Sequence, residues 1–295
     1  MLSLKSSNSS NAIKFRKAKP NRLGGKLVGW WDFTDTSTLF KTVGGVNATA
    51  ATDPIGQVLN KAHNTRWGRA GDNGLGQYLY ALTTARPLLG VDAGNGYFYA
   101  DFDGAAQEMT AISDQSKGGV ALDKLTDSSI TFAAFTMFAV FNPHDATISA
   151  DQYIFRILSD NASEITLYIH SDTTDTIKGI NANGATRTNK TVASGVTNAT
   201  GTQLWTWVSN CDHNGSTSDI YKNKDTSTGA GNQPGNSGSV DLTGGSNDNR
   251  VSIGGNGASS SEYDGGVFEI LFYNALLSDI EINTIERYLT KKYGL

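Results

Sequence analysis

The sequence is poor in cysteine and proline, with one cysteine and five prolines among 295 residues. With Cys211 alone, the chain can form no internal disulfide and no thiolate metal cluster, so its stability must come from packing. No stretch approaches the ~18 consecutive apolar residues that span a bilayer, and no apolar signal core follows the first lysines. We therefore expect a soluble protein without an export signal and without membrane insertion.

Glycine is frequent instead, with 33 residues, and Ser, Thr and Asn are abundant in every third of the chain. Hydrophobic residues make up 38% of the sequence and charged residues only 18%. This composition is typical of many short strands joined by polar turns, rather than of helical bundles or α/β enzymes. The length fits one large β-sandwich with an extension.

The charge is distributed unevenly along the chain. The net charge is −4, yet residues 1–26 contain seven basic side chains and no acid, which leaves −11 for the remainder. This segment opens with a polar, low-complexity stretch that buries too little apolar surface to fold alone. We predict an extended basic arm that docks on an acidic partner, although a solubilising tail is an alternative. The predicted anchoring residues are Lys14, Arg16, Lys17, Lys19 and Arg22.

From residue 27 onward, short apolar segments bounded by turn residues predict a single β domain over 27–295. The strand candidates are 27–33, 77–82, 97–104, 130–141, 153–158, 165–170, 177–180, 204–208, 220–222, 251–255 and 267–273. Residues 43–96 show little periodicity and are expected to form long rim loops with short strands. Residues 223–249 are almost wholly polar and are expected to form a surface loop.

The C-terminal segment predicts a buried strand followed by the one convincing helix. Residues 267–273 are apolar on both faces, which indicates a strand between two layers. Ser278 and Glu281 have the spacing of a capping box, and Gly294 offers a C-terminal stop. The apolar stripe of the helix consists of Ile282, Ile285 and Leu289.

The order of these motifs resembles a known superfamily. The series consists of Gly29-Trp30-Trp31-Asp32-Phe33, the turn Phe102-Asp103-Gly104, the strand 135–141, Ile220 to Asn223, Val251 to Gly255 and the closing FEILFYNALLSDIE. Further motifs in the first third are 31–39, 53–59 and Ala85-Arg86-Pro87. It is similar to the concanavalin A-like, laminin G-like jelly roll, in a version common in phage structural proteins. The resemblance covers residues 27–295. It implies an all-β fold, a two-sheet antiparallel β-sandwich (jelly roll) with one short C-terminal helix, beside the extended N-terminal arm. Lectins, glycosidases, adhesion modules and structural proteins share this fold, so the fold alone does not decide the function.

No catalytic pattern is visible in the sequence. Glycosidases of this fold carry three acids on one strand as E-x-D-x-x-E, and no strand candidate has that pattern. Asp279, Glu281 and Glu286 lie on the predicted helix, where capping, the helix dipole and solvation account for them. Cys211 and His213 lack an orienting third group and are interpreted as loop residues. We predict that the protein is not an enzyme and uses no cofactor, with a glycoside hydrolase as the least favoured reading.

Metal and nucleotide sites are not indicated either. His63, His144 and His170 are far apart and show no metal-ligand spacing. Asp101 and Asp103 have the oxygen ligands that calcium prefers, but a turn of the kind found in the family is the favoured interpretation. The glycine-rich runs lack the nucleotide-binding patterns G-x-G-x-x-G and G-K-S/T. We therefore predict no metal site.

Aromatic residues in polar loops are the candidates for sugar binding. Most tryptophans are expected in the core, with Trp30 and Trp31 pointing to opposite faces of their strand. Trp67 lies in the loop WGRAGDNG and Tyr263 in the loop SSSEYDGG. These two residues are predicted to be exposed and to stack on glycans.

Taken together, these patterns predict a non-enzymatic phage virion structural protein located in the virion. The favoured version is a capsid-associated decoration or head-fibre protein, anchored by its arm and displaying a glycan-binding sandwich. The alternative is a tail-associated, receptor-binding lectin whose specificity lies around Trp67 and in residues 223–262. In either case the expected partners are other virion proteins, of capsid or tail, in a larger homo- or hetero-oligomeric assembly, together with cell-surface glycans.

Overall fold

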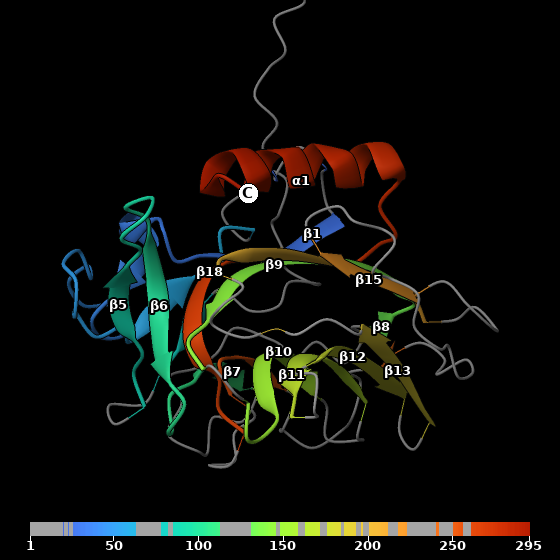
Figure 1. Cartoon of the computed structure of the whole chain (residues 1–295), viewed down its shortest axis with the longest axis horizontal. Coiled ribbons are helices and arrows are strands. Elements are labelled where there is room, and N and C mark those ends of the chain that lie inside the picture. Colours follow the sequence, from blue (N-terminus) through green and yellow to red (C-terminus); the bar gives the residue numbers. More distant parts are fainter. Residues whose placement is uncertain are drawn as a thin grey trace, which may run out of the picture.

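Two β-sheets packed face to face form the body of the protein, and one helix lies across one of them (Figure 1). This computed structural model describes residues 20, 23, 26–62, 78–81, 85–112, 131–145, 148–158, 163–171, 176–183, 186–192, 196, 201–211, 218–222, 240–241, 250–255 and 261–295. Within these residues every strand pair is antiparallel. The prediction of an antiparallel β-sandwich with a C-terminal helix is confirmed.

The sheet beneath the helix, called the helix-side sheet, is built around the last strand of the chain. Its members are β1 (Leu27–Asp32), β5 (Leu88–Val91), β6 (Phe98–Asp103), β9 (Ala134–Pro143), β14 (Gln203–Asn210), β15 (Ser218–Lys222) and β18 (Asp264–Tyr273). Their order is β15-β14-β9-β18-β6-β5, with β1 pairing β18 as well. Strand β18 pairs β6 near its start, β1 near its end and β9 along its length, so it is the centre of this sheet.

The second sheet, called the opposite sheet, has the order β13-β12-β11-β10-β17-β7-β4-β3-β2. Its members are β2 (Leu39–Phe40), β3 (Gln57–Leu59), β4 (Tyr78–Tyr80), β7 (Met109–Ile112), β10 (Gln152–Leu158), β11 (Glu164–His170), β12 (Thr176–Asn183), β13 (Thr186–Val192) and β17 (Arg250–Ile253). A small two-stranded piece pairs β8 (Thr131–Phe132) with β16 (Val240–Asp241). Strand β16 lies inside the segment 223–249, which the sequence predicts to be a loop throughout.

The main core fills the space between the two sheets, because alternate residues of each strand point inward. Trp31 packs against Phe155 at 5.8 Å between ring centroids, and Phe155 stacks on Phe272 at 5.6 Å. Trp30 belongs to a separate apolar cluster beneath the helix. The prediction that Trp30 and Trp31 face opposite ways is therefore confirmed.

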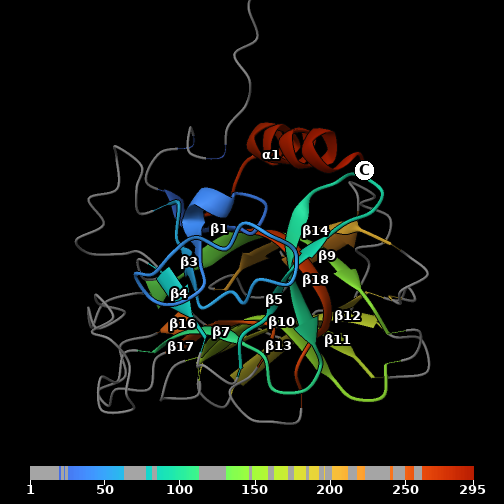
Figure 2. The same cartoon turned by 90° about the vertical axis from the view of Figure 1, so that its left-hand side faces the viewer.

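Helix α1 (Asp279–Tyr293) covers the outer face of the helix-side sheet (Figure 2). The Ser278 side chain accepts a hydrogen bond from the Glu281 backbone N–H, and the Glu281 carboxylate accepts one from the Ser278 N–H at 2.8 Å. Gly294 ends the helix in the left-handed conformation, at φ 73°. The predicted capping box and stop are confirmed.

One acid of the helix differs from expectation. Glu286 was expected to be solvated, but it is buried and accepts a hydrogen bond at 2.8 Å from the Thr206 hydroxyl of β14. The reason is its position one residue after Ile285, on the part of the helix surface that faces the sheet. In the described part of the chain, no helix is long and apolar enough to cross a membrane.

The segment before β1 contacts the body close to the helix. The Tyr273 hydroxyl donates to the Pro20 carbonyl at 3.3 Å, and Leu23 packs on the cluster beneath α1. Lys26 forms an ion pair with Glu281 at 2.9 Å. Outside the described residues lie Lys14, Arg16, Lys17, Lys19 and Arg22, the residues predicted to anchor the arm.

Candidate functional site

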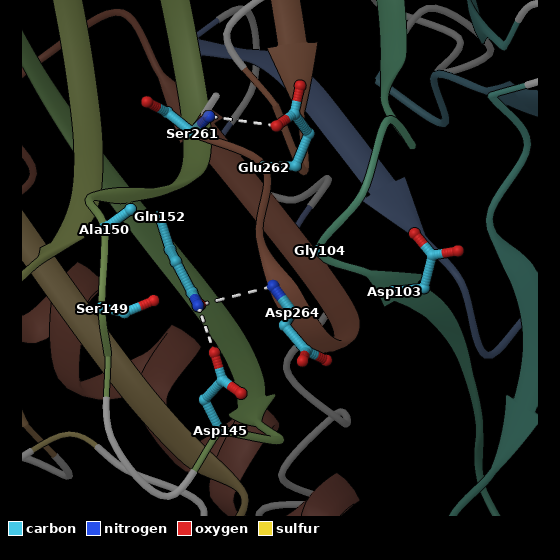
Figure 3. A pocket seen from close by; sticks show the side chains of 9 residues that line it. All are labelled: Asp103, Gly104, Asp145, Ser149, Ala150, Gln152, Ser261, Glu262 and Asp264. Atoms are coloured by element: carbon cyan, nitrogen blue, oxygen red, sulfur yellow. Dashed lines mark hydrogen bonds between the residues drawn. The ribbon is translucent and has the colours of Figure 1, made fainter. Parts of the chain in front are cut away.

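A polar pocket of about 230 Å³ opens at one rim of the sandwich, where the two sheets meet (Figure 3). The ends of β6 and β9 and the starts of β10 and β18 converge there. The pocket is lined by Asp103, Gly104, Asp145, Ser149, Ala150, Gln152, Ser261, Glu262 and Asp264. Four of these nine residues are acids, and none of the nine is basic.

Gln152 connects the two sheets at the base of this rim pocket. Its Nε2 donates to the Asp145 carboxylate at 2.7 Å, and its Oε1 accepts from the Asp264 backbone N–H at 3.3 Å (Figure 3). Because Gln152 belongs to the opposite sheet and Asp264 to the helix-side sheet, one amide fixes the distance between the sheets at the pocket. The acids are therefore held by the framework of both sheets.

Two acids at the rim, Asp101 and Asp264, have raised pKa values. Burial and then the neighbouring Asp145 raise the pKa of Asp264. Burial raises the pKa of Asp101 as well, and its neighbour Asp103 adds to this. His144 counteracts both shifts, because its Nδ1 lies 3.5 Å from Asp101 and 3.8 Å from Asp264. Perturbed carboxyls in a surface pocket are a common mark of a functional site.

Two half-buried tyrosines and His144 form a shelf beside the pocket, which we call the tyrosine shelf (Tyr97, Tyr99 and His144). Tyr99 lies across Gly90 and Gly266, where a Cβ on Gly266 would come within 2.7 Å of the ring and a Cβ on Gly90 would overlap it. Absence of side chains at these two positions therefore lets the ring lie flat on the sheet. His144 packs edge-on against Tyr99, with 6.1 Å between ring centroids.

Shelf and pocket form one continuous surface through His144, which contacts Tyr99 on one side and the acids Asp101 and Asp264 on the other. At the far end of the shelf, Tyr97 packs edge-on against Tyr293 of α1 at 5.5 Å. This surface joins aromatic ring edges and faces to hydrogen-bond acceptors. Such a combination suits a ligand with apolar C–H faces and many hydroxyl groups.

The sequence prediction for Tyr263 is wrong as to exposure, because the side chain is fully buried. Its ring packs near Phe102 and Phe141, at 6.3 and 6.1 Å between centroids. Its backbone N–H donates to the Gly254 carbonyl at 2.8 Å, which places the residue directly at the start of β18 with its ring turned into the core. A polar loop sequence thus hid an inward-pointing aromatic, and Tyr263 is not available to stack on a glycan. Trp67 lies outside the described residues.

Other candidates from the sequence have structural surroundings. Asp103 accepts hydrogen bonds from the Ala105 N–H at 3.1 Å and from Gln107 at 3.0 Å, as expected for a turn. In the part of the chain that the structure describes, no three His, Cys, Asp or Glu side chains come together as a metal-binding group. Cys211 is buried in the core, and His213 lies outside the described residues.

The sequence did not predict the tyrosine shelf, because residues 97–104 show only the pattern of a strand that ends in a turn. Strand alternation offered a signal, since Tyr97, Tyr99, Asp101 and Asp103 all fall on one face. Nothing in the sequence placed His144 beside them.

No family model matches this chain, and no curated protein matches it. Among solved structures, it is similar to the CBM40 domain of the Ruminococcus gnavus IT-sialidase, with 13% identity and a TM-score of 0.40 over 52% of this chain and 83% of that one. Another structure of that domain is bound to α2,3-sialyllactose. The chain is also similar to the Trypanosoma rangeli sialidase, with 13% identity and a TM-score of 0.47, and covers a third of it (33%) with 90% of its own length. At this level of similarity neither structure assigns a function to the chain.

Proposed function

We propose that this chain is a non-enzymatic structural protein of a phage virion, whose sandwich binds glycans at the rim. The observation that supports the glycan part is the continuity of the tyrosine shelf with the acid-lined pocket. Sugar rings pack their C–H faces on aromatic side chains, and carboxylates accept hydrogen bonds from sugar hydroxyls. Both elements are present within one surface built on strands of a rigid sandwich.

The charge of the rim restricts the class of glycan. Asp101 and Asp264 already resist ionisation, and a carboxylate on the ligand would add a further negative charge beside them. Like charges at close range disfavour binding. The ligand is therefore a neutral glycan, and a sialylated glycan binds more weakly than its neutral counterpart.

Binding of paired glycans to the full-length protein tests this proposal. The measurement compares lactose-type oligosaccharides with their sialylated forms on an array and by calorimetry. Tyr99→Ala should weaken binding of the neutral glycan by ~3- to 10-fold, the range expected from one aromatic contact. The matched control is Tyr153→Ala, a half-buried tyrosine of the opposite sheet, which should leave affinity unchanged. Absence of binding in the wild type, or equal loss in both variants, would remove the glycan function.

The virion part of the proposal rests on the ordered motif series and on the basic arm. Pro20, Leu23 and Lys26 of the predicted arm 1–26 contact the body, so the deletion that tests anchoring is limited to residues 1–19. Deleting 1–19 should abolish incorporation into particles, and neutralising Lys14, Arg16, Lys17 and Lys19 to Gln should reduce it strongly. Normal incorporation of the truncated protein would contradict anchoring.

Adsorption of particles to host cells distinguishes a capsid decoration from a tail-borne lectin. Particles that carry Tyr99→Ala should adsorb less well if the protein is the tail-borne lectin, and normally if it is a capsid decoration.

A further inference from the structure

A second group of charged side chains lies sealed beneath the C-terminal turn of α1. Asp32 of β1 and Glu269 of β18 are register partners on adjacent strands, and both point toward the helix. Lys292 of α1 reaches between them. Its Nζ lies 3.0 Å from each carboxylate oxygen of Asp32 and 2.7 Å from Oε2 of Glu269. The side chains of Asp32 and Glu269 are only 4% and 0% exposed.

The surroundings of this cluster shield both carboxylates from water, while the Lys292 side chain is 16% exposed. The Glu269 carboxylate accepts hydrogen bonds from Trp30 Nε1 at 2.7 Å, from the Tyr293 hydroxyl at 2.7 Å and from the Tyr288 hydroxyl at 3.4 Å. The Lys292 ammonium lies 5.1 Å from the centre of the Tyr293 ring. Aromatic residues thus surround the Glu269 carboxylate and flank the Lys292 amine.

Two further groups hold the Asp32 carboxylate in place. Lys61 Nζ lies 2.9 Å from its Oδ2, and the Thr34 hydroxyl and backbone N–H donate to its Oδ1 at 2.6 and 3.1 Å. These donors would stabilise negative charge that develops on the carboxyl oxygens. Lys292 Nζ is equidistant from both oxygens, as in a bidentate ion pair, so the amine and the carboxyl group are in contact before any bond forms.

We propose that Lys292 and Asp32 condense to an intramolecular amide bond, with Glu269 as the catalytic residue that transfers protons. The Lys292 ammonium first gives a proton to Glu269. The free amine then attacks Asp32 Cγ, the new C–N bond forms and one Cγ–O bond breaks. The departing oxygen takes two of the three ammonium protons, relayed through Glu269, and leaves as water, while the third stays on the amide nitrogen. Ammonium and carboxylate therefore become amide and water with no oxidant or further reactant.

The cluster supplies a proton acceptor for this reaction, whereas the pKa of Asp32 is lowered, because the effect of burial is outweighed by the ammonium groups of Lys292 and Lys61. Burial, followed by the charge of Asp32, raises the pKa of Glu269, so this carboxylate is a stronger proton acceptor than an exposed one. Burying an ammonium and a carboxylate is costly, whereas an amide is neutral. Condensation removes two charges from a site that is largely shielded from solvent.

The bond would connect the first strand to the last helix. It would close a loop from residue 32 to residue 292, nearly the whole chain, so that α1 could not detach from β1 without breaking a covalent bond.

Lys61 is a less suitable nucleophile than Lys292. Its ammonium also forms an ion pair with the half-exposed Asp35 at 2.8 Å, and among the described residues it contacts no second buried acid.

Intact mass of the denatured full-length protein tests the proposal directly. The wild type should be lighter than its sequence by the mass of one water molecule, and proteolysis should release a branched peptide that contains Asp32 and Lys292. Lys292→Arg keeps the positive charge but should have the full sequence mass, and Glu269→Gln should have it too or lose water far more slowly. The matched control is Lys26→Arg, which alters a surface ion pair and should still lack one water.

Circular dichroism of each variant establishes that it is folded before its mass is interpreted. A wild-type protein at the full sequence mass after prolonged incubation would overturn the proposal. So would a branched peptide that joins Asp32 to Lys61, or loss of the water at an Asp-Gly sequence such as Asp103-Gly104 through succinimide formation.

Discussion

Strand β18 carries two acids in contrasting environments, Glu269 beneath α1 and Asp264 at the rim. In the sealed cluster, Asp32 and Glu269 are almost inaccessible and share the ammonium of Lys292. At the rim, the side chains of Asp101 and Asp264 are 38% and 30% exposed, and within the described residues their one basic neighbour is His144. Buried charges must be satisfied internally, whereas open acids retain hydrogen-bonding capacity for a ligand. Two acidic residues five positions apart on one strand thus lie in different surroundings, one satisfied inside the fold and one accessible at the rim.

Removing the cation of the sealed cluster should have the largest effect. Lys292→Met removes both the cation beside Asp32 and Glu269 and the amine that the proposed amide needs, so the two acids stay buried without a partner cation. It should lower the free energy of unfolding by about 3–5 kcal/mol, measured by denaturant titration.

The matched control is Lys26→Met, which removes the exposed ion pair to Glu281 and should cost no more than about 1 kcal/mol at neutral pH. Hydrogen bonds from Lys26 and from the Ser278 backbone lower the pKa of Glu281 to about 2. This ion pair therefore stabilises the fold fully at pH values above 4.5, the ordinary pKa of a glutamate. Its contribution should be lost as the pH falls toward 2. Similar losses in the two lysine variants at neutral pH would remove the distinction between sealed and exposed charge.

A change beneath the shelf should affect the open site more than the fold. Gly90→Ala introduces a methyl group where Tyr99 lies, so the ring must tilt away from the sheet. We expect a loss of about 1–2 kcal/mol in stability and a larger fractional loss of glycan affinity, measured by calorimetry. Gly94→Ala, in a loop where the nearest atom to the new methyl is 3.2 Å away, is the matched control and should leave affinity unchanged. Unchanged affinity in Gly90→Ala would show that the orientation of Tyr99 is not part of the site.

The smallest effect on stability is expected at the rim, and here the substitution should stabilise the protein, whereas the substitutions above should destabilise it. The folded protein raises the pKa of Asp264 above 3.8, so it binds that proton more tightly than the unfolded chain. Stability is therefore lost as the pH rises from 3.8 through the raised pKa. Asp264→Asn removes this cost and should raise the melting temperature at neutral pH by up to about 2 °C, kept small by solvent screening.

Below pH 3.8 the gain from Asp264→Asn should disappear, because the wild-type carboxyl is then protonated as well. Thermal melts across this range check both the sign and the pH window. A lower melting temperature at neutral pH would show that Asp264 is structural, like the acids beneath α1.

Much of the fold could be predicted because its signals are local. Apolar runs of a few residues identified β9, β11, β14 and β18, and the capping box identified α1 to within a residue. Strand β13 was missed because its sequence, TRTNKTV, is almost wholly polar and shows no apolar alternation. Strand β16 is only two residues long and lies within polar sequence, so no period could reveal it.

The candidate site was predictable only in part, because its members come from distant positions. Gln152 and Asp264 are separated by 112 residues, and no local pattern brings their side chains together. Tyr263 shows the opposite failure, because its polar sequence neighbourhood predicts an exposed loop, whereas its ring, just before β18, is buried in the core. The sequence places Asp101 and Asp103 on one face of their strand. It does not show that His144 lies beside Asp101 and connects it to the tyrosine shelf.

By itself, the sequence determined the all-β class, the terminal helix with its caps and the opposite orientations of the Trp30 and Trp31 side chains. These features follow from strand alternation and helix capping, which act within a few residues. Only the tertiary structure decided which acids are sealed and which are open. Lys292 meets Asp32 across 260 positions of the chain, and that meeting depends on how β1, β18 and α1 pack. The environment of a charge is set by packing between distant segments, and its chemistry follows from that environment.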